Sequence, residues 1–127
     1  MESARADAAR LTIDGVRAAL RYARETFICS AERPILMGRS PDCDLVVPLP
    51  WISRKHATIE IRGEQVYLTD SSTSGTYVAM EGQEPFVVRR ESHLIHTGCT
   101  LSLARSHTDP GAQIVSCELL VPKDESA

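Results

Sequence analysis

The chain has no long apolar run, and only 5% of its 127 residues are aromatic. No stretch approaches the roughly 18 consecutive apolar residues that a membrane-spanning helix needs. The N-terminus also lacks the apolar core of a signal peptide. A basic excess is missing too, because the formal net charge is −3, which argues against a nucleic-acid-binding surface. We therefore expect no membrane span, no nucleic-acid partner and a cytoplasmic location.

Closely spaced cysteines are also absent. The chain has no CxxC pair, which argues against a zinc ribbon or a redox dithiol, and its cysteines are Cys29, Cys43, Cys99 and Cys117. We expect reduced, mostly buried thiols. The spacing His93-x-x-His96-x-x-Cys99 does not favour a metal site, because residues three apart on a strand face opposite sides and Gly98 breaks a helix. We expect no metal and no cofactor.

What the chain does have is the composition of one globular domain. Its 43% apolar and 24% charged content is typical of a folded protein, and 127 residues suffice for one core. The Ala-, Arg- and Asp-rich start reads as a tail or short helix, and the last residues are polar. We expect a tail or short helix over residues 1–16, one domain over 17–122 and a polar tail over 123–127.

Short apolar runs separated by turns dominate the interior of the chain. Two of them, Ala57–Ile61 and Gln65–Thr69, alternate on either side of Arg62-Gly63-Glu64 and predict a β-hairpin. The predicted strands cover residues 20–22, 26–31, 35–37, 45–47, 57–61, 65–69, 76–78, 86–88, 100–103 and 114–121. Strands at intervals of roughly ten residues indicate an all-β, antiparallel sandwich.

Three segments place cationic or hydroxyl donors at the edges of these runs. The segments are Gly38-Arg39-Ser40, Ser53-Arg54-Lys55-His56 and Asp70-Ser71-Ser72-Thr73-Ser74-Gly75-Thr76. Arg and hydroxyl groups together suit a phosphate dianion on a partner protein. Taken singly, each segment also fits ordinary turn structure, in which Ser and Asp side chains bond nearby backbone groups.

In order and spacing, these segments resemble the forkhead-associated (FHA) domain. The amino-acid sequences of the loops resemble those of bacterial members. That family has a strand-end Gly-Arg, a Ser-x-x-His about fifteen residues later and an Asp-x-Ser-Thr-Asn-Gly-Thr loop. The resemblance covers roughly Leu20 to Val121 and implies a β-sandwich of about eleven strands that binds phosphothreonine through loops at one end.

The resemblance also implies residue roles. Arg39 and Ser53 correspond to the main phosphate ligands, Thr73 to a third contact, and Arg54 to a peptide or phosphate contact. Positions of loop architecture are Gly38, His56, Asp70 and Gly75, with Asp44 helping to fix its loop. Ser74 stands where the family usually has an Asn that holds the main chain of the ligand, so recognition of the ligand backbone is expected to be weaker or altered.

Two alternatives remain at this point. Nucleophilic catalysis by Ser53 with His56 is not favoured, because nothing in the sequence places an orienting carboxylate beside His56; we expect no enzyme activity. The main alternative is a phosphorylation-independent interaction or dimerisation domain, joined to or associated with a signalling enzyme such as a nucleotide cyclase.

Trp51 fits either a partner contact or an anchor at the edge of the core. The oligomeric state stays open.

Overall fold

The computed structural model describes residues 15–122, and this part of the chain consists of strands joined by turns and loops. The strands are β1 (Arg17–Tyr22), β2 (Glu25–Cys29), β3 (Ile35–Gly38), β4 (Leu45–Val46), β5 (Ala57–Arg62), β6 (Gln65–Asp70), β7 (Thr76–Met80), β8 (Phe86–Val88), β9 (Ser92–Ile95), β10 (Cys99–Leu103) and β11 (Ile114–Leu120). None of the described segments is a helix that could cross a membrane.

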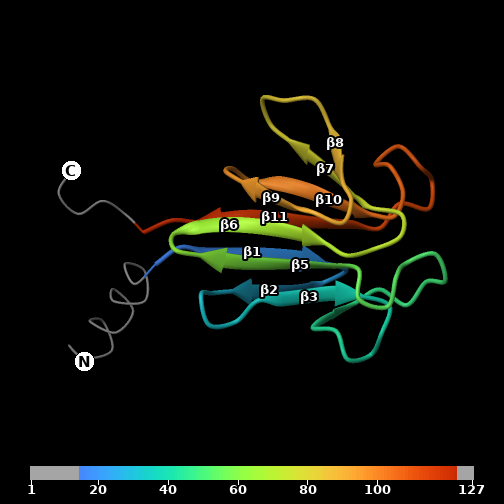
Figure 1. The fold of residues 1–127 in the computed structure, drawn as a ribbon, viewed down its shortest axis with the longest axis horizontal. Coiled ribbons are helices and arrows are strands. Elements are labelled where there is room, and N and C mark those ends of the chain that lie inside the picture. Colours follow the sequence, from blue (N-terminus) through green and yellow to red (C-terminus); the bar gives the residue numbers. More distant parts are fainter. Residues whose placement is uncertain (1–14, 123–127) are drawn as a thin grey trace.

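The strands form two sheets that pack face to face (Figure 1). One sheet has the order β2-β1-β11-β10-β7-β8, and the other has the order β4-β3-β5-β6-β9. Alternation of side chains explains the packing, because every second residue of a strand faces the same side. In β5, for example, Ala57, Ile59 and Ile61 are buried in the core between the sheets, whereas Thr58 and Glu60 are partly exposed.

The three segments with cationic or hydroxyl donors lie at one end of this sandwich. The β3–β4, β4–β5 and β6–β7 connections emerge at the right-hand end in Figure 1, together with the long β10–β11 loop. The β2–β3 and β5–β6 turns lie at the opposite end. The sheets therefore bring residues near positions 39, 53 and 73 to the same rim of the molecule.

The all-β sandwich predicted from the sequence is confirmed, including the β5–β6 hairpin, in which Arg62 pairs with Gln65. Two details differ. β9 was not predicted, because Ser92-His93-Leu94-Ile95 has only two apolar residues and no alternation. One pair, β3 with β4, is parallel within an otherwise antiparallel arrangement. The tails expected over residues 1–16 and 123–127 lie mostly outside the described residues.

Candidate functional site

The glycine at the end of β3 lets two loops touch. A Cβ added at Gly38 would lie 2.1 Å from the backbone oxygen of Arg54, far closer than any real contact. The next residues continue this contact, since the Arg39 N–H donates to Ser53 O at 3.0 Å and the Ser40 N–H donates to Arg54 O at 3.1 Å. The β3–β4 and β4–β5 loops are therefore joined backbone to backbone, which requires glycine at position 38.

Arg39 is held at the rim by its own side chain. Its Nε–H donates to Ile52 O at 2.9 Å, while the residue as a whole stays exposed. This bond uses one donor of the guanidinium and leaves the terminal nitrogens to bind an anion. Asp44 fixes the other side of the same loop, because its carboxylate accepts from the Leu36 N–H at 2.8 Å.

His56 is completely buried and links the β4–β5 loop to the β6–β7 loop. Its Nδ1 accepts from the Ser53 N–H at 3.1 Å, and its Nε2 lies 2.8 Å from Gly75 O, to which it donates. These two bonds define the neutral form with the proton on Nε2. Burial lowers the pKa of the imidazole, which is opposed by its bond to Gly75 and by the charge of Asp70.

The β6–β7 loop is organised around the buried carboxylate of Asp70. Its Oδ1 accepts from the Ser72 N–H at 2.9 Å and the Arg90 N–H at 3.0 Å, and its Oδ2 accepts from the Thr76 hydroxyl at 2.7 Å. The Ser72 hydroxyl in turn accepts from the Gly75 N–H at 2.7 Å. Because these donors come from both ends of the loop and from the β8–β9 connection, Asp70 fixes the shape of the loop.

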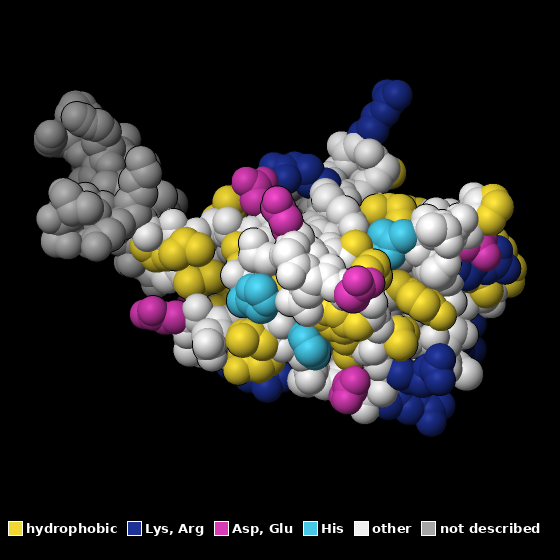
Figure 2. All heavy atoms as spheres, turned by 90° about the horizontal axis from the view of Figure 1, so that it is seen from above, with side chains coloured by type: hydrophobic (Ala, Val, Ile, Leu, Met, Phe, Trp, Pro, Cys, Tyr) yellow, Lys and Arg dark blue, Asp and Glu magenta, His cyan; other side chains and the backbone are white. Residues whose placement is uncertain are grey.

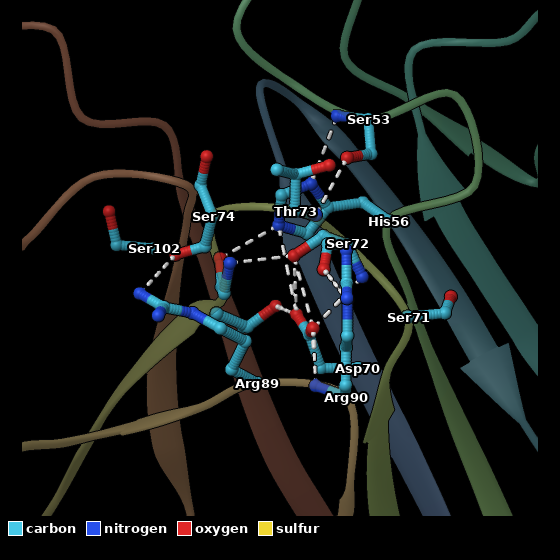
Figure 3. Close-up of polar contacts among 12 residues, drawn as sticks. Ser53, His56, Asp70, Ser71, Ser72, Thr73, Ser74, Arg89, Arg90 and Ser102 are labelled. Carbon is cyan, nitrogen blue, oxygen red and sulfur yellow. Dashed lines mark hydrogen bonds and ion pairs between the residues drawn. The ribbon is translucent and has the colours of Figure 1, made fainter.

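Ser53 and Thr73 meet across the two loops. The Thr73 N–H donates to Ser53 Oγ at 3.3 Å, and Figure 3 shows the two side chains next to each other at the top of the loop. Thr73 is exposed and Ser53 is partly exposed. Through its bond to Ile52, the residue before Ser53, Arg39 belongs to the same cluster. The structure thus brings together the three residues predicted as phosphate contacts.

Ser74 follows Thr73 with its hydroxyl turned away from the loop (Figure 3). Within residues 15–122, no hydrogen bond involves this hydroxyl, whereas Ser74 O accepts from Arg89 Nη2 at 3.5 Å. Gly75 then has a φ of 94°, and a Cβ there would lie 2.8 Å from Val87 Cγ2. Glycine is therefore required at position 75 by both conformation and space.

Several residues of the site were missed in the sequence. Ser72 and Thr76 hold the carboxylate of Asp70, and Arg89 and Arg90 contact the loop from the β8–β9 connection. For Ser72 and Thr76, the high content of Ser and Thr in the loop sequence could have indicated a role in holding the loop. No local pattern marks Arg89 and Arg90, since their contacts join residues 15 and 18 positions apart.

Trp51 lies beside this cluster, partly buried against the core. The guanidinium of Arg105 in the β10–β11 loop stacks on it, with its central carbon 3.7 Å from the ring centroid, and Arg105 is also 3.5 Å from Asp109. The same loop is tied to the site by the Ala104 N–H, which donates to Gly75 O at 2.9 Å. Trp51 therefore anchors the β10–β11 loop at the edge of the core.

The histidines do not form a metal centre. Among residues 15–122, no three His, Cys, Asp or Glu side chains come together in an arrangement that could hold a metal ion. Figure 2 shows the exposed His side chains of one face lying apart from one another among apolar side chains. All four cysteines are buried and free.

This chain is similar to known proteins in both sequence and fold. The family model described as FHA domain matches residues 35–104. FHA domain-containing protein FhaB of Mycobacterium tuberculosis is 40% identical over 52 residues, which cover 40% of this chain and 34% of that protein. The chain thus matches about a third of the length of this relative.

Two solved structures show the same fold at low sequence identity. The Mycobacterium tuberculosis Rv1747 FHA-1 domain has a TM-score of 0.62 and 17% identity, covering 83% of this chain and 97% of that one. The N-terminal FHA domain of S. cerevisiae Rad53p, in complex with a phosphothreonine peptide, has a TM-score of 0.61 and 19% identity, covering 87% and 95%. Because the family model matches more than half of the length of this chain, the chain belongs to the FHA domain family.

Proposed function

We propose that the chain is a phosphothreonine-dependent protein-binding module, which recognises phosphorylated partner segments through the loops at one end of its β-sandwich. The observation that carries the proposal is the cluster of Arg39, Ser53 and Thr73. The backbone N–H of Arg39 donates to Ser53 O, its guanidinium is anchored to Ile52 O, and the Thr73 N–H donates to the Ser53 hydroxyl oxygen. A phosphate offers several acceptor oxygens to such donors. The Rad53p domain of the same fold holds a phosphothreonine peptide, which supports this reading.

The affinity of such a site follows from its donors. Each charge-assisted hydrogen bond contributes about 1.5–3 kcal/mol. Several of them, reduced by the cost of ordering a peptide, give about −8 kcal/mol, or micromolar affinity. Arg54 and Ser74 are the neighbouring contacts for the peptide around the phosphate. Both flank the cluster in the chain, and Arg54 is exposed.

Binding without catalysis is the better proposal for Ser53 and His56. His56 accepts from the backbone N–H of Ser53 and not from its hydroxyl, so the ring is not placed to activate that oxygen. The carboxylate of Asp70 is 3.9 Å from Nε2, which instead donates to Gly75 O. The histidine is used to hold loops. We further propose a cytoplasmic location, which the four buried free thiols support.

Calorimetric titration with a phosphothreonine peptide library tests the proposal. We expect micromolar binding of some phosphopeptides, no binding of the same peptides without phosphate, and a loss of at least tenfold in Arg39→Ala. Arg33→Ala, in the β2–β3 turn at the opposite end (Figure 1), is the matched control and should bind normally. Equal binding by Arg39→Ala and wild type would refute the proposed site.

A second candidate is a phosphorylation-independent interaction or dimerisation domain of a larger signalling protein, for example a nucleotide cyclase. The Ser74 hydroxyl, at the position of the usual Asn, favours it. This hydroxyl has no hydrogen-bond partner within residues 15–122, and a serine offers the ligand backbone fewer hydrogen bonds than an Asn amide does. Light scattering and binding to an unphosphorylated partner separate the two. A monomer that binds only phosphopeptides supports the first proposal. A dimer, or a partner bound without phosphate, supports the second.

A further inference from the structure

Two arginines approach the Thr73 loop from outside the family motif. Arg89 and Arg90 lie in the connection between β8 and β9, which crosses from one sheet to the other. Arg90 Nε donates to Ser72 O at 3.2 Å, and Arg89 Nη2 donates to Ser74 O at 3.5 Å. These carbonyls belong to the residues on either side of Thr73. Figure 3 shows both arginines below the loop and Ser53 above it.

These guanidinium groups carry charge that the described part of the chain does not neutralise. Elsewhere, Arg21, Arg62 and Arg105 each lie within 4.0 Å of a carboxylate. Within residues 15–122, neither Arg89 nor Arg90 has such an ion pair, and their side chains bond only to carbonyl oxygens. Both residues are exposed, and each guanidinium retains further N–H donors. This surface therefore presents positive charge and free donors to an approaching anion.

The backbone at Arg90 is held in a conformation that favours glycine. Its φ is 55°, in the left-handed region that residues with a Cβ rarely adopt. The Arg90 N–H donates to Asp70 Oδ1 at 3.0 Å, which fixes this conformation from the buried centre of the loop. The same carboxylate thus shapes the Thr73 loop and directs Arg90 against it. Such strained positions cluster at ligand-binding sites.

We propose that Arg89 and Arg90 form a second anion site, next to the phosphothreonine site and on the other flank of Thr73. Its ligand is a second negative group on the same peptide, either the carboxylate of an acidic residue or another phosphate. The inference rests on the proposed function, because it assigns the charge pattern of the segment that carries the phosphothreonine. The preferred partner is a phosphothreonine segment with a further anionic side chain.

Three sets of synthetic peptides test this site by calorimetry. The first has one phosphothreonine and neutral neighbours, the second moves a single Glu through the flanking positions, and the third carries a second phosphate in the best Glu position. The proteins compared are wild type, Arg89→Gln, Arg89→Gln/Arg90→Gln and the matched control Arg33→Gln, which removes the same charge from the opposite end. The single variant guards against loss of the Arg90 contacts with the loop.

We expect one Glu position to strengthen binding to wild type and the control by up to roughly fivefold, as exposed ion pairs do. A phosphate there should strengthen it more, and either gain should shrink in Arg89→Gln and vanish in the double variant. The neutral phosphopeptide should bind wild type and Arg33→Gln alike, and in each variant the gain from an added anion is measured against the affinity of that same variant for the neutral phosphopeptide. If the neutral phosphopeptide binds but an added anion does not raise the affinity, the second site is refuted and the proposed function stands. The same holds if the rise in affinity survives both substitutions. If no phosphopeptide binds wild type, the proposed function fails with it.

Discussion

Single atoms decide whether the loops of this domain can meet. At Gly38 the backbone of β3 runs so close to Arg54 O that no side chain fits. Gly98 offers a contrast, because a Cβ there would lie 3.4 Å from Cys117 O, an ordinary contact. The two glycines look alike in the sequence, yet only the first is required by a close approach of two loops.

Gly38→Ala should therefore destabilise the domain by about 1–3 kcal/mol, the usual cost of overpacking. It should also weaken phosphopeptide binding, because Arg39 would shift with the backbone. Urea unfolding followed by calorimetry measures both effects. Gly98→Ala is the matched control and should lie close to wild type. A stable Gly38→Ala variant with normal binding would contradict the close approach.

Buried His56 makes stability depend on pH. Burial lowers its pKa below the ordinary value of 6.5, so the unfolded chain binds a proton more readily than the folded one. The contribution of neutral His56 is thus present above pH 6.5 and is lost as the pH falls below it. A proton on Nδ1 would also remove the acceptor of the Ser53 N–H.

We expect the melting temperature to fall as the pH is lowered from neutral to mildly acidic values, and this slope to flatten in His56→Gln whatever the absolute stability of that variant. His96→Gln, at an exposed histidine, is the matched control and should keep the wild-type slope. An unchanged slope in His56→Gln would show that other groups govern the acid sensitivity.

At the scale of elements, the β6–β7 loop depends on one carboxylate. Asp70→Asn replaces an oxygen that accepts hydrogen bonds with an amide that donates, facing the N–H and hydroxyl donors of Ser72, Thr76 and Arg90. We expect a loss of about 1.5–3 kcal/mol in the free energy of unfolding, together with weaker phosphopeptide binding. Chemical denaturation and calorimetry test this.

Ser71→Ala is the control within the same loop. Its exposed hydroxyl donates to Lys55 O at 3.1 Å, so its removal should change stability by no more than about 0.5 kcal/mol. Similar losses in both variants would mean that the loop is held by many weak contacts and not by Asp70.

The elements themselves show what a sequence can reveal. Alternating runs such as β5 and β6 could be predicted, because one face of each strand is buried. β9 was not predicted, because its polar and apolar residues do not alternate. It is an edge strand that pairs only with β6. The order of the loop motifs indicated Arg39, Ser53 and Thr73. The contacts of Arg89 and Arg90 could not be predicted, since they depend on where the β8–β9 connection crosses between the sheets.

At the scale of the whole molecule, charge is unevenly distributed. The net charge is −3, yet at the loop end exposed Arg39, Arg54, Lys55, Arg89 and Arg90 outnumber the exposed carboxylates Asp42, Asp44 and Glu91. Figure 2 shows a group of Lys and Arg side chains toward this end of the face in view. A local positive field can attract an anionic peptide even when the net charge repels it. Phosphopeptide affinity should therefore fall with rising salt, less steeply in Arg89→Gln/Arg90→Gln than in Arg33→Gln. Titrations across ionic strengths would test this, and equal slopes would contradict it.

The backbone bonds between the loops also have a kinetic consequence. Because Arg39, Ser53 and Thr73 are already tied together in the free domain, little ordering remains for the moment of encounter. The rate of association is then set by diffusion and charge, and should exceed the roughly 10⁵–10⁶ M⁻¹s⁻¹ of uncharged pairs at low salt. Differences among partner segments would appear in how long each complex lasts, so the domain would sort its partners by residence time.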